Sequence, residues 1–191
     1  MKTGLFFGSF NPIHIGHLIL ASYMAEFADL KQVWFVVSPH NPLKQKKTLL
    51  NDYQRLDMVK LAIDDNPKFK AIDIEFKLPQ PNYTIDTLTH LQEKFPKKKF
   101  VLIIGEDNLK NFHKWKNHEV LLEQYELYVY PRKDLLQKSI LAEHPKVKMI
   151  DAPVVEISSS FIRNAIKNKK DVQYMLPYKV AQYLEEMNFY K

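Results

Sequence analysis

Short, wholly apolar segments alternate along this chain with longer segments of helical periodicity, and this alternation constrains the fold more than any other feature of the sequence. Residues 5–7 and 33–37 are too few and too uniformly apolar for amphipathic helices, so both are predicted strands. Between them, residues 17–28 carry apolar side chains at the spacing of one helix face. A strand, a helix and a strand form a β-α-β unit, with parallel strands and a right-handed crossover.

The same alternation continues to the end of the chain. Further helices are expected at residues 53–63, 84–94, 159–167 and 178–187, and further strands at residues 72–76, 100–104, 127–130 and 147–150. Such a chain is expected to form a three-layer, Rossmann-like α/β fold with a mostly parallel sheet. Ligands of these folds bind at the carboxyl ends of the strands. With 191 residues, a single domain is expected.

Composition excludes some functions and leaves others open. The chain has no cysteine, which rules out disulfides, thiolate nucleophiles and cysteine-ligated metal sites. Its net charge of +6 favours anionic partners, whether nucleic acid, a membrane surface or small phosphates. The amino-terminal segment is unlike a signal peptide, and no stretch approaches the roughly 18 apolar residues of a membrane span. A cytoplasmic protein without a membrane partner is therefore expected.

The densest functional signal is the sequence GSFNPIHIGH at residues 8–17, between the first strand and the first helix. Gly8 ends the strand and allows the backbone to approach a ligand, while Pro12 fixes its own φ and keeps Asn11 extended. The helix begins inside the motif, so its free N–H groups point at whatever lies above the strand ends. A helix start of this kind attracts phosphate.

Two histidines lie within this motif. His14 and His17 are three residues apart, so both rings lie on one side of the first helical turn, and Gly16 leaves that surface free of side-chain bulk. Both imidazoles could donate hydrogen bonds to phosphate oxygens. A helix-capping histidine and a metal-binding pair are the alternatives, but no third metal ligand with suitable spacing is evident. The flanking strand, glycines and proline favour the phosphate site.

Residues 8–17 resemble the nucleotidyltransferase superfamily, whose hallmark is H-x-G-H in this strand-to-helix position. The wider G-S-F-N-P-x-H-x-G-H is similar to that of the bacterial nicotinate mononucleotide adenylyltransferases. Their usual form has two initial glycines, and threonine and aspartate where this chain has Ser9 and Asn11, which also keep short polar side chains. The letters HIGH also resemble class I aminoacyl-tRNA synthetases, but those enzymes have far longer chains and a Lys-Met-Ser-Lys-Ser loop.

A second motif, ISSSFIR, occupies residues 157–163. A serine cluster before an apolar-periodic run predicts a helix N-cap. Ser159 and Arg163 are four residues apart, so they share a face of a helix end that favours anions. The motif is similar to the second signature of the same family, I-S-S-T-x-I-R, which binds the triphosphate; here Ser160 replaces the threonine. The resemblance implies that a carboxyl-terminal helical part, from about residue 157, completes the ATP site.

Two shorter segments also match the family. PHNPLK at residues 39–44 resembles its phosphate-contacting loop, with Lys44 as the ligand, although Lys44 alone would pass for a surface lysine. YTIDTL at residues 83–88 resembles the nicotinate-side segment, with Thr84 near the pyridine ring. Without the resemblance, Thr84 would be interpreted only as a helix cap.

A third segment, IIGEDNLKNFHKW at residues 103–115, is expected on the loop that leaves the most apolar strand. Gly105 would allow close backbone approach, and Asp107 could accept hydrogen bonds from ribose hydroxyls or cap a helix. Trp115 matches the tryptophan that stacks on the nicotinate ring in this family. A lone tryptophan is more often a core residue, but the lysines on both sides of Trp115 favour a surface-facing site.

The resemblance implies transfer of the adenylyl group of ATP to nicotinate mononucleotide, giving nicotinate adenine dinucleotide and pyrophosphate in NAD biosynthesis. It implies catalysis by His14 and His17, and Mg²⁺ that is held mainly by the ATP phosphates, without protein metal ligands. Nicotinate-nucleotide contacts are implied at Thr84 and Trp115. ATP and phosphate contacts are implied at Gly8, Ser9, Phe10, Gly16, Lys44, Gly105, Asp107, Ser158, Ser159, Phe161, Ile162 and Arg163.

Other functions and assemblies stay open. Enzymes of the same superfamily that use nicotinamide mononucleotide, pantetheine phosphate or glycerol phosphate are the nearest alternatives, although Trp115 together with residues 83–88 favours a pyridine nucleotide. A nucleic-acid-binding module is disfavoured, because the lysines are dispersed and no basic and aromatic residues interleave. A homo-oligomer is possible. Core packing is favoured over a subunit contact for the carboxyl-terminal aromatic residues Tyr174, Tyr178, Tyr183, Phe189 and Tyr190.

Overall fold

Six parallel strands form one sheet in the computed structural model, which describes residues 1–39, 49–133 and 139–191. Each neighbouring pair is parallel, in the order β3-β2-β1-β4-β5-β6. The strands are β1 (Lys2–Gly8), β2 (Leu30–Val37), β3 (Phe69–Ile72), β4 (Lys99–Gly105), β5 (Glu126–Tyr130) and β6 (Val147–Met149). The predicted Rossmann-like fold is confirmed, and its described strands are parallel throughout.

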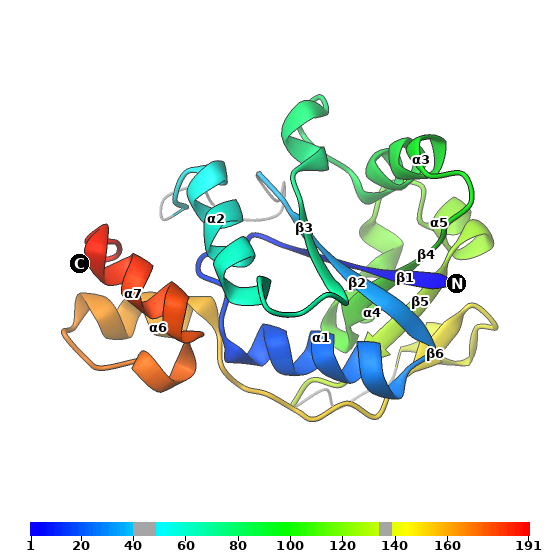
Figure 1. Cartoon of the computed structure of the whole chain (residues 1–191). Helices are drawn as coiled ribbons and strands as arrows, with labels where there is room; N and C mark the ends of the chain where they lie inside the picture. Colours follow the sequence, from blue (N-terminus) through cyan, green and yellow to red (C-terminus); the bar gives the residue numbers. More distant parts are fainter. Residues whose placement is uncertain (40–48, 134–138) are drawn as a thin grey trace.

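Helices cover both faces of the sheet. They are α1 (Ile15–Phe27), α2 (Asp52–Ile63), α3 (Thr84–Lys94), α4 (Glu106–Lys110), α5 (His118–Gln124), α6 (Ser159–Lys167) and α7 (Tyr178–Glu186). Short 3₁₀ helices are η1 (Ile74–Lys77), η2 (Phe112–Lys114), η3 (Ile140–Glu143) and η4 (Gln173–Met175). Figure 1 shows α1 and α3 on opposite sides of the sheet, with α2, α6 and α7 gathered beyond the carboxyl end of β1. No helix in the described part of the chain is long and apolar enough to cross a membrane.

Alternate strand residues build two separate cores. Phe6 and Phe35 belong to the first core, which includes side chains of α1, α2 and α7, whereas Leu5 and Trp34 belong to the second core, which includes side chains of α3 and α5. Successive side chains of a strand point to opposite faces, and here both faces are covered. This is why the strands are continuous apolar runs rather than alternating ones.

The prediction of a strand at residues 72–76 is wrong. β3 ends at Ile72, and the chain then turns into η1, where Ile74 is buried in the second core. β3 is an edge strand that pairs with β2 over only four residues, so its sequence carries no uniformly apolar run. The segment at residues 103–115 is also not a plain loop, because it contains α4 and η2.

The strand order predicts a ligand crevice between the carboxyl ends of β1 and β4. The chain leaves β1 into α1 on one face of the sheet and leaves β4 into α4 on the other. Connections that diverge in this way open a crevice at the carboxyl ends of the two strands, where open α/β sheets bind their ligands. The motif at residues 8–17 follows β1, and Gly105 ends β4, so both lie at this crevice.

A buried carboxyl group joins η1 to α3. Glu75 accepts a hydrogen bond of 2.8 Å from Thr87 Oγ1, and both residues are buried. Burial raises the pKa of Glu75, while the hydroxyls of Ser38 and Thr87 oppose that shift. Thr89, an exposed residue two positions further along α3, donates its hydroxyl to the carbonyl oxygen of Ile85 at 3.0 Å.

We expect Thr87→Val to lower the free energy of unfolding by about 1–3 kcal/mol, because the buried carboxyl group loses a donor while the side-chain shape is kept. Thr89→Val is the matched control, and its effect should stay within about 0.5 kcal/mol, as for most surface changes. Urea unfolding of both variants provides the measurement. Equal effects would mean that the Thr87 hydroxyl is of no special importance to the fold.

Candidate active site

The loop after β1 is folded back on the strand that it leaves. Gly8 accepts a hydrogen bond of 2.9 Å from the backbone N–H of Ser38, which follows β2. Phe10 has a left-handed backbone with φ of 45°, and its buried ring lies over Gly8. A Cβ at position 8 would lie 2.9 Å from Phe10 Cζ. The space that glycine leaves at position 8 is therefore filled by Phe10, and not by open room for a ligand.

The two histidines stack against each other at the start of α1. His14 is the N-cap, and His17 lies on the first turn, with the ring centroids 3.7 Å apart. The backbone N–H of His14 donates to Nδ1 of His17 at 3.2 Å. Because Nδ1 accepts this bond, a neutral His17 ring carries its proton on Nε2. His17 thus combines a capping contact through one nitrogen with a donor at the other.

The environment of His14 keeps its imidazole neutral. The residue is only 5% exposed, and among the described residues Nδ1 has no hydrogen-bond partner. Burial, helped by the positive charge of Arg132, lowers the pKa of His14 to about 4. A Cβ on Gly16 would lie 3.1 Å from His14 Nδ1 and 3.0 Å from Val155 Cγ1, so only glycine lets these groups pack this closely. An anion beside the ring would favour its protonated form.

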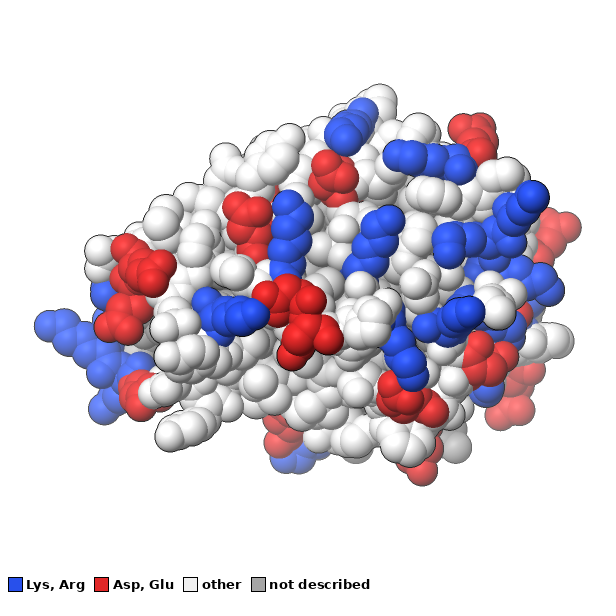
Figure 2. Space-filling view, in the orientation of Figure 1, with Lys and Arg blue, Asp and Glu red and all other residues white. Residues whose placement is uncertain are grey.

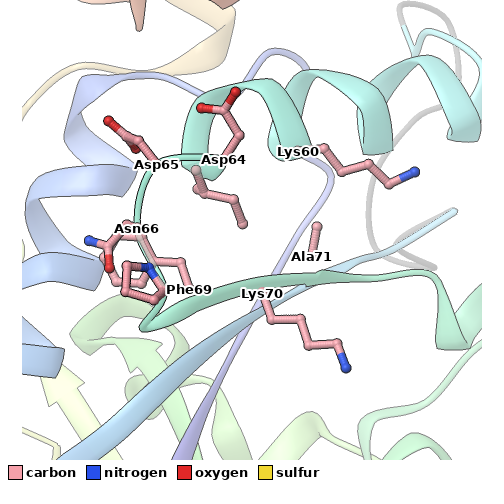
Figure 3. A pocket seen from close by; sticks show the side chains of 9 residues that line it. Lys60, Asp64, Asp65, Asn66, Phe69, Lys70 and Ala71 are labelled. Atoms are coloured by element: carbon pink, nitrogen blue, oxygen red, sulfur yellow. The ribbon is translucent and has the colours of Figure 1, made fainter.

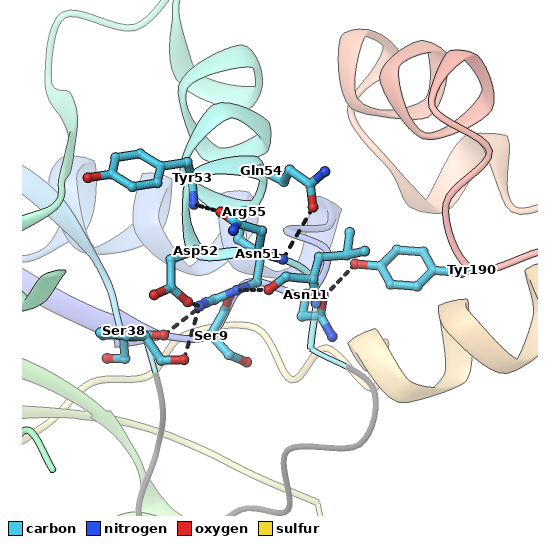
Figure 4. Close-up of polar contacts among 11 residues, drawn as sticks. Ser9, Asn11, Ser38, Asn51, Asp52, Tyr53, Gln54, Arg55 and Tyr190 are labelled. Carbon is cyan, nitrogen blue, oxygen red and sulfur yellow. Dashed lines mark hydrogen bonds and ion pairs between the residues drawn. The ribbon is translucent and has the colours of Figure 1, made fainter. Parts of the chain in front are cut away.

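The loop between β1 and α1, residues 9–14, is called the histidine loop below. A fully buried guanidinium group connects this loop to its surroundings (Figure 4). Arg55 of α2 uses its five N–H donors on five acceptors. The acceptors are the carbonyl oxygens of Ser9, Ser38, Pro39 and Leu50, at 2.6, 2.8, 3.1 and 3.1 Å, and Oδ1 of Asp52 at 2.5 Å. Sequence motifs did not indicate Arg55; its one signal is an arginine at a core-facing helix position, four residues before buried Val59.

The two sequence signatures meet in space. Ser159 Oγ donates to the carbonyl oxygen of Pro12 at 2.9 Å, across 147 positions of sequence. Arg163 Nη1 donates to the carbonyl oxygen of Asn11 at 2.8 Å, and its Nη2 to Ser160 Oγ at 3.1 Å. In this structure, these side chains of α6 therefore hold the histidine loop.

The remaining residues of the second signature differ in exposure. Ser158 is the N-cap of α6, and its Oγ accepts from the backbone N–H of Phe161 at 3.2 Å. Phe161 is half exposed, whereas Ile162 is fully buried in the first core. The side chain of Ile162 is therefore closed to a ligand, and its backbone N–H donates within the helix to the carbonyl oxygen of Ser158 at 3.1 Å.

An arginine that the motifs do not include follows β5 and contributes to the lowered pKa of His14. Arg132 Nε lies 3.5 Å from Oδ1 of Asp107, and the guanidinium lies 5.2 Å from the ring centre of Tyr130. A Cβ on Gly105 would clash with Asp107 Oδ1 and lie 3.2 Å from Arg132 Nε, so glycine permits this pairing. The charge of Arg132 also reaches His14. Its signal in the sequence is a basic residue two positions after a buried strand.

The segments predicted to contact a pyridine ring lie side by side. Thr84 is the first residue of α3, and Trp115 follows η2, half buried, with its ring 5.1 Å from that of Phe112. Lys116 Nζ lies 2.9 Å from Asp86 Oδ2 and 4.6 Å from the ring centre of Tyr83. These contacts join the Trp115 segment to the first turn of α3.

Two further predictions concern Lys44 and the carboxyl-terminal aromatic residues. Lys44 is outside the described residues. Tyr183, Phe189 and Tyr190 pack against the first core as expected, but Tyr174 and Tyr178 are 90% and 65% exposed, contrary to the expectation of core packing.

A hollow of about 540 Å³ lies between the end of α2 and β3. Figure 3 shows Lys60 and Asp64 on the α2 side and Lys70 on β3. None of the sequence-predicted site residues in the described part of the chain lines it. Figure 2 shows positive side chains gathered towards the right of the visible face, with negative side chains around them.

The lowered pKa of His14 predicts a loss of stability in acid. The unfolded chain, with an ordinary histidine pKa of 6.5, binds a proton that folded His14 takes up only near pH 4. The free energy of unfolding should therefore fall as the pH is lowered through this window, by about 3 kcal/mol for His14. Urea unfolding of the wild type and His14→Gln between about pH 7 and pH 4 tests this. The variant should lose less stability; equal losses would contradict the prediction.

Comparisons with known proteins agree with this geometry. The chain matches the model of the cytidylyltransferase-like family over residues 5–165. A "Probable nicotinate-nucleotide adenylyltransferase" of Flavobacterium johnsoniae is 62% identical over 192 residues, covering 100% of both chains. A protein of Bacteroides fragilis with the same description is 49% identical over 176 residues, covering 92% of this chain and 87% of the relative.

Solved structures share the fold at low identity. The nicotinic acid mononucleotide adenylyltransferase of Plasmodium falciparum, complexed with NaAD, has a TM-score of 0.83 at 21% identity, covering 100% of this chain and 98% of the other. The same enzyme complexed with APC has a TM-score of 0.81 at 20% identity, covering 99% and 96%. The family match and the close relatives together show that this chain belongs to the cytidylyltransferase-like family and, within it, to the nicotinate-nucleotide adenylyltransferases.

Proposed function

We propose that this protein transfers the adenylyl group of ATP to nicotinate mononucleotide, giving nicotinate adenine dinucleotide and pyrophosphate in NAD biosynthesis. The observation that carries the proposal is the close pair of imidazole rings of His14 and His17 at the start of α1, beside the carboxyl ends of the paired strands β1 and β4. The shared description of the close relatives supports the choice of substrates.

The reaction needs little covalent chemistry from the protein. A phosphate oxygen of the mononucleotide attacks the α-phosphorus of ATP, and the bond from that phosphorus to the oxygen bridging to the β-phosphate breaks. A phosphate monoester has its second pKa near about 6, so the nucleophile is already largely dianionic at neutral pH and needs no general base. The protein's task is to hold two anions in line and to offset the charge on the departing pyrophosphate.

The groups around the histidines suit that task. His17 would donate from Nε2, while a dianionic neighbour would raise the pKa of His14 so that this ring also becomes a charged donor. The free N–H groups at the start of α1, around Gly16, add positive potential. Arg132, whose charge already reaches His14, would hold a further phosphate oxygen.

The ATP side of the site combines α6 with the ends of β1 and β4. Arg163 and Ser159 hold the loop that carries the histidines, and the first turn of α6 with Ser158 would face the triphosphate together with Lys44. In this proposal, α6 completes the ATP site, and Asp107 beside Gly105 serves the ribose.

Mg²⁺ would enter with the triphosphate. Imidazole, guanidinium and backbone N–H groups suit phosphate oxygens and not a bare cation, and among the described residues no group of three His, Cys, Asp or Glu side chains could hold a metal. When bound, the ion neutralises charge on the triphosphate.

The direct test is to incubate the protein with Mg-ATP and each of the mononucleotides of nicotinate and nicotinamide, and with pantetheine phosphate, and to measure pyrophosphate and the dinucleotide product. We expect the highest kcat/KM with nicotinate mononucleotide. A preference for the nicotinamide form or for pantetheine phosphate would keep the enzyme class but overturn the proposed acceptor.

His14→Ala and His17→Ala should each lower kcat by roughly 10²- to 10³-fold, the usual effect of losing a donor that acts in the transition state. ATP binding, measured by calorimetry, should fall much less. His90→Ala, on α3 outside the proposed site, is the matched control and should leave kcat unchanged. Near-normal turnover in both variants would contradict the role of His14 and His17 as donors in the transition state.

Trp115→Ala should raise the KM for nicotinate mononucleotide by about tenfold and that for ATP much less, because aromatic stacking contributes on the order of 1–3 kcal/mol. Trp115→Phe keeps a stacking surface and should recover part of the loss. Steady-state kinetics with each substrate varied in turn gives both constants. Equal effects on the two substrates would identify Trp115 as a core residue only.

A further inference from the structure

The chain reverses direction after α7. Asn188 has a left-handed backbone with φ of 53°, a conformation that asparagine tolerates better than most residues. Its N–H donates to the carbonyl oxygen of Glu185 at 3.1 Å, and the N–H of Phe189 donates to that of Leu184 at 3.0 Å. This pair of bonds is the Schellman arrangement, which ends a helix and turns the chain back.

The reversal brings Tyr190 to the loop that carries the histidines. Its hydroxyl lies 2.6 Å from Asn11 Oδ1 (Figure 4), an oxygen that also accepts the backbone N–H of Leu50 at 3.2 Å. The carbonyl oxygen of Asn11 accepts Arg163 Nη1 at 2.8 Å. Asn11 is thus held by three segments that are far apart in the sequence.

Tyr190 makes this contact from an unfavourable backbone. Its φ is 63°, which costs on the order of 1–3 kcal/mol for a bulky residue and persists only where the surroundings determine it. Burial raises the pKa of the Tyr190 hydroxyl, an effect that the positive charges of Arg163 and Arg55 reduce. The hydroxyl is therefore protonated at neutral pH and donates to Asn11.

We propose that Tyr190 is a positioning residue for adenylyl transfer: by holding Asn11 it fixes the loop between Gly8 and His14, and so the placement of the two histidines. The proposal rests on the proposed function. Only two residues separate Asn11 from His14, and Ile13 between them is fully buried, so a displacement of Asn11 is transmitted to the imidazole pair.

Tyr190→Phe removes the hydroxyl and keeps the ring that packs on the first core. A net hydrogen bond of ordinary strength predicts a fall in kcat of about three- to tenfold. The KM values for both substrates should stay within about twofold, and the melting temperature should fall by roughly 2–4 °C, as expected for the loss of about 1 kcal/mol. Tyr174→Phe, at a tyrosine that is 90% exposed, is the matched control and should change none of these quantities.

A second pair of variants tests the chain reversal at Asn188, which places Tyr190 beside Asn11. Asn188→Gly keeps the left-handed conformation and should retain kcat, whereas Asn188→Val disfavours it and should lower kcat as Tyr190→Phe does. In the Tyr190→Phe background, Asn188→Val should lower kcat no further. Additive losses would overturn the proposal, as would an unchanged kcat in Tyr190→Phe or a loss confined to one KM.

Hydrogen exchange in the free protein separates this inference from the proposed function. Backbone amides of residues 9–17 should exchange faster in Tyr190→Phe than in the wild type or Tyr174→Phe. Unchanged exchange would overturn the role of Tyr190 whatever the substrate. If amides of residues 9–17 exchange faster in Tyr190→Phe but the wild type makes no dinucleotide, the proposed function is overturned. The contact by which Tyr190 holds the loop would still be established.

Discussion

The placement of the candidate site depends on the buried guanidinium of Arg55. A charge excluded from water is tolerated only when its donors are satisfied, and here oxygens of the segments after β1 and β2 and at the start of α2 satisfy all five. The planar guanidinium group of Arg55 also fixes the direction of each hydrogen bond, which a lysine in the same place would not do. The five hydrogen bonds of Arg55 therefore link these segments to one another.

Local sequence patterns predicted correctly those helices and strands in which the pattern is pronounced. The bounds of α3 and α6 agree with the sequence interpretation, since both helices combine an apolar stripe with a clear start. The strand expected at residues 72–76 failed because the alternation of Ile72, Ile74 and Phe76 fits an edge strand and a following 3₁₀ turn equally well. Whether these residues form a strand or a 3₁₀ turn depends on the pairing of β3 with β2, and the sequence of one segment does not determine that pairing.

The site was predictable only in part, for a related reason. The motif at residues 8–17 could be placed at the strand ends because it sits between a strand and a helix. The contact of Ser159 with Pro12, and the approach of Arg132 to His14, join residues more than a hundred positions apart. Such contacts exist only once the sheet is assembled, so no spacing rule reveals them.

The parallel sheet has a consequence for how charge relates to activity. All described strands end at one edge, where α1 presents peptide N–H groups and two arginines approach from neighbouring segments. In the proposed function, attraction for phosphate at that edge comes from these N–H groups together with the nearby histidine and arginine side chains, and lysines over the rest of the surface add little to it. A homologue with an acidic isoelectric point could hold the same nucleotides equally well, so evolutionary drift in surface charge would leave this chemistry untouched.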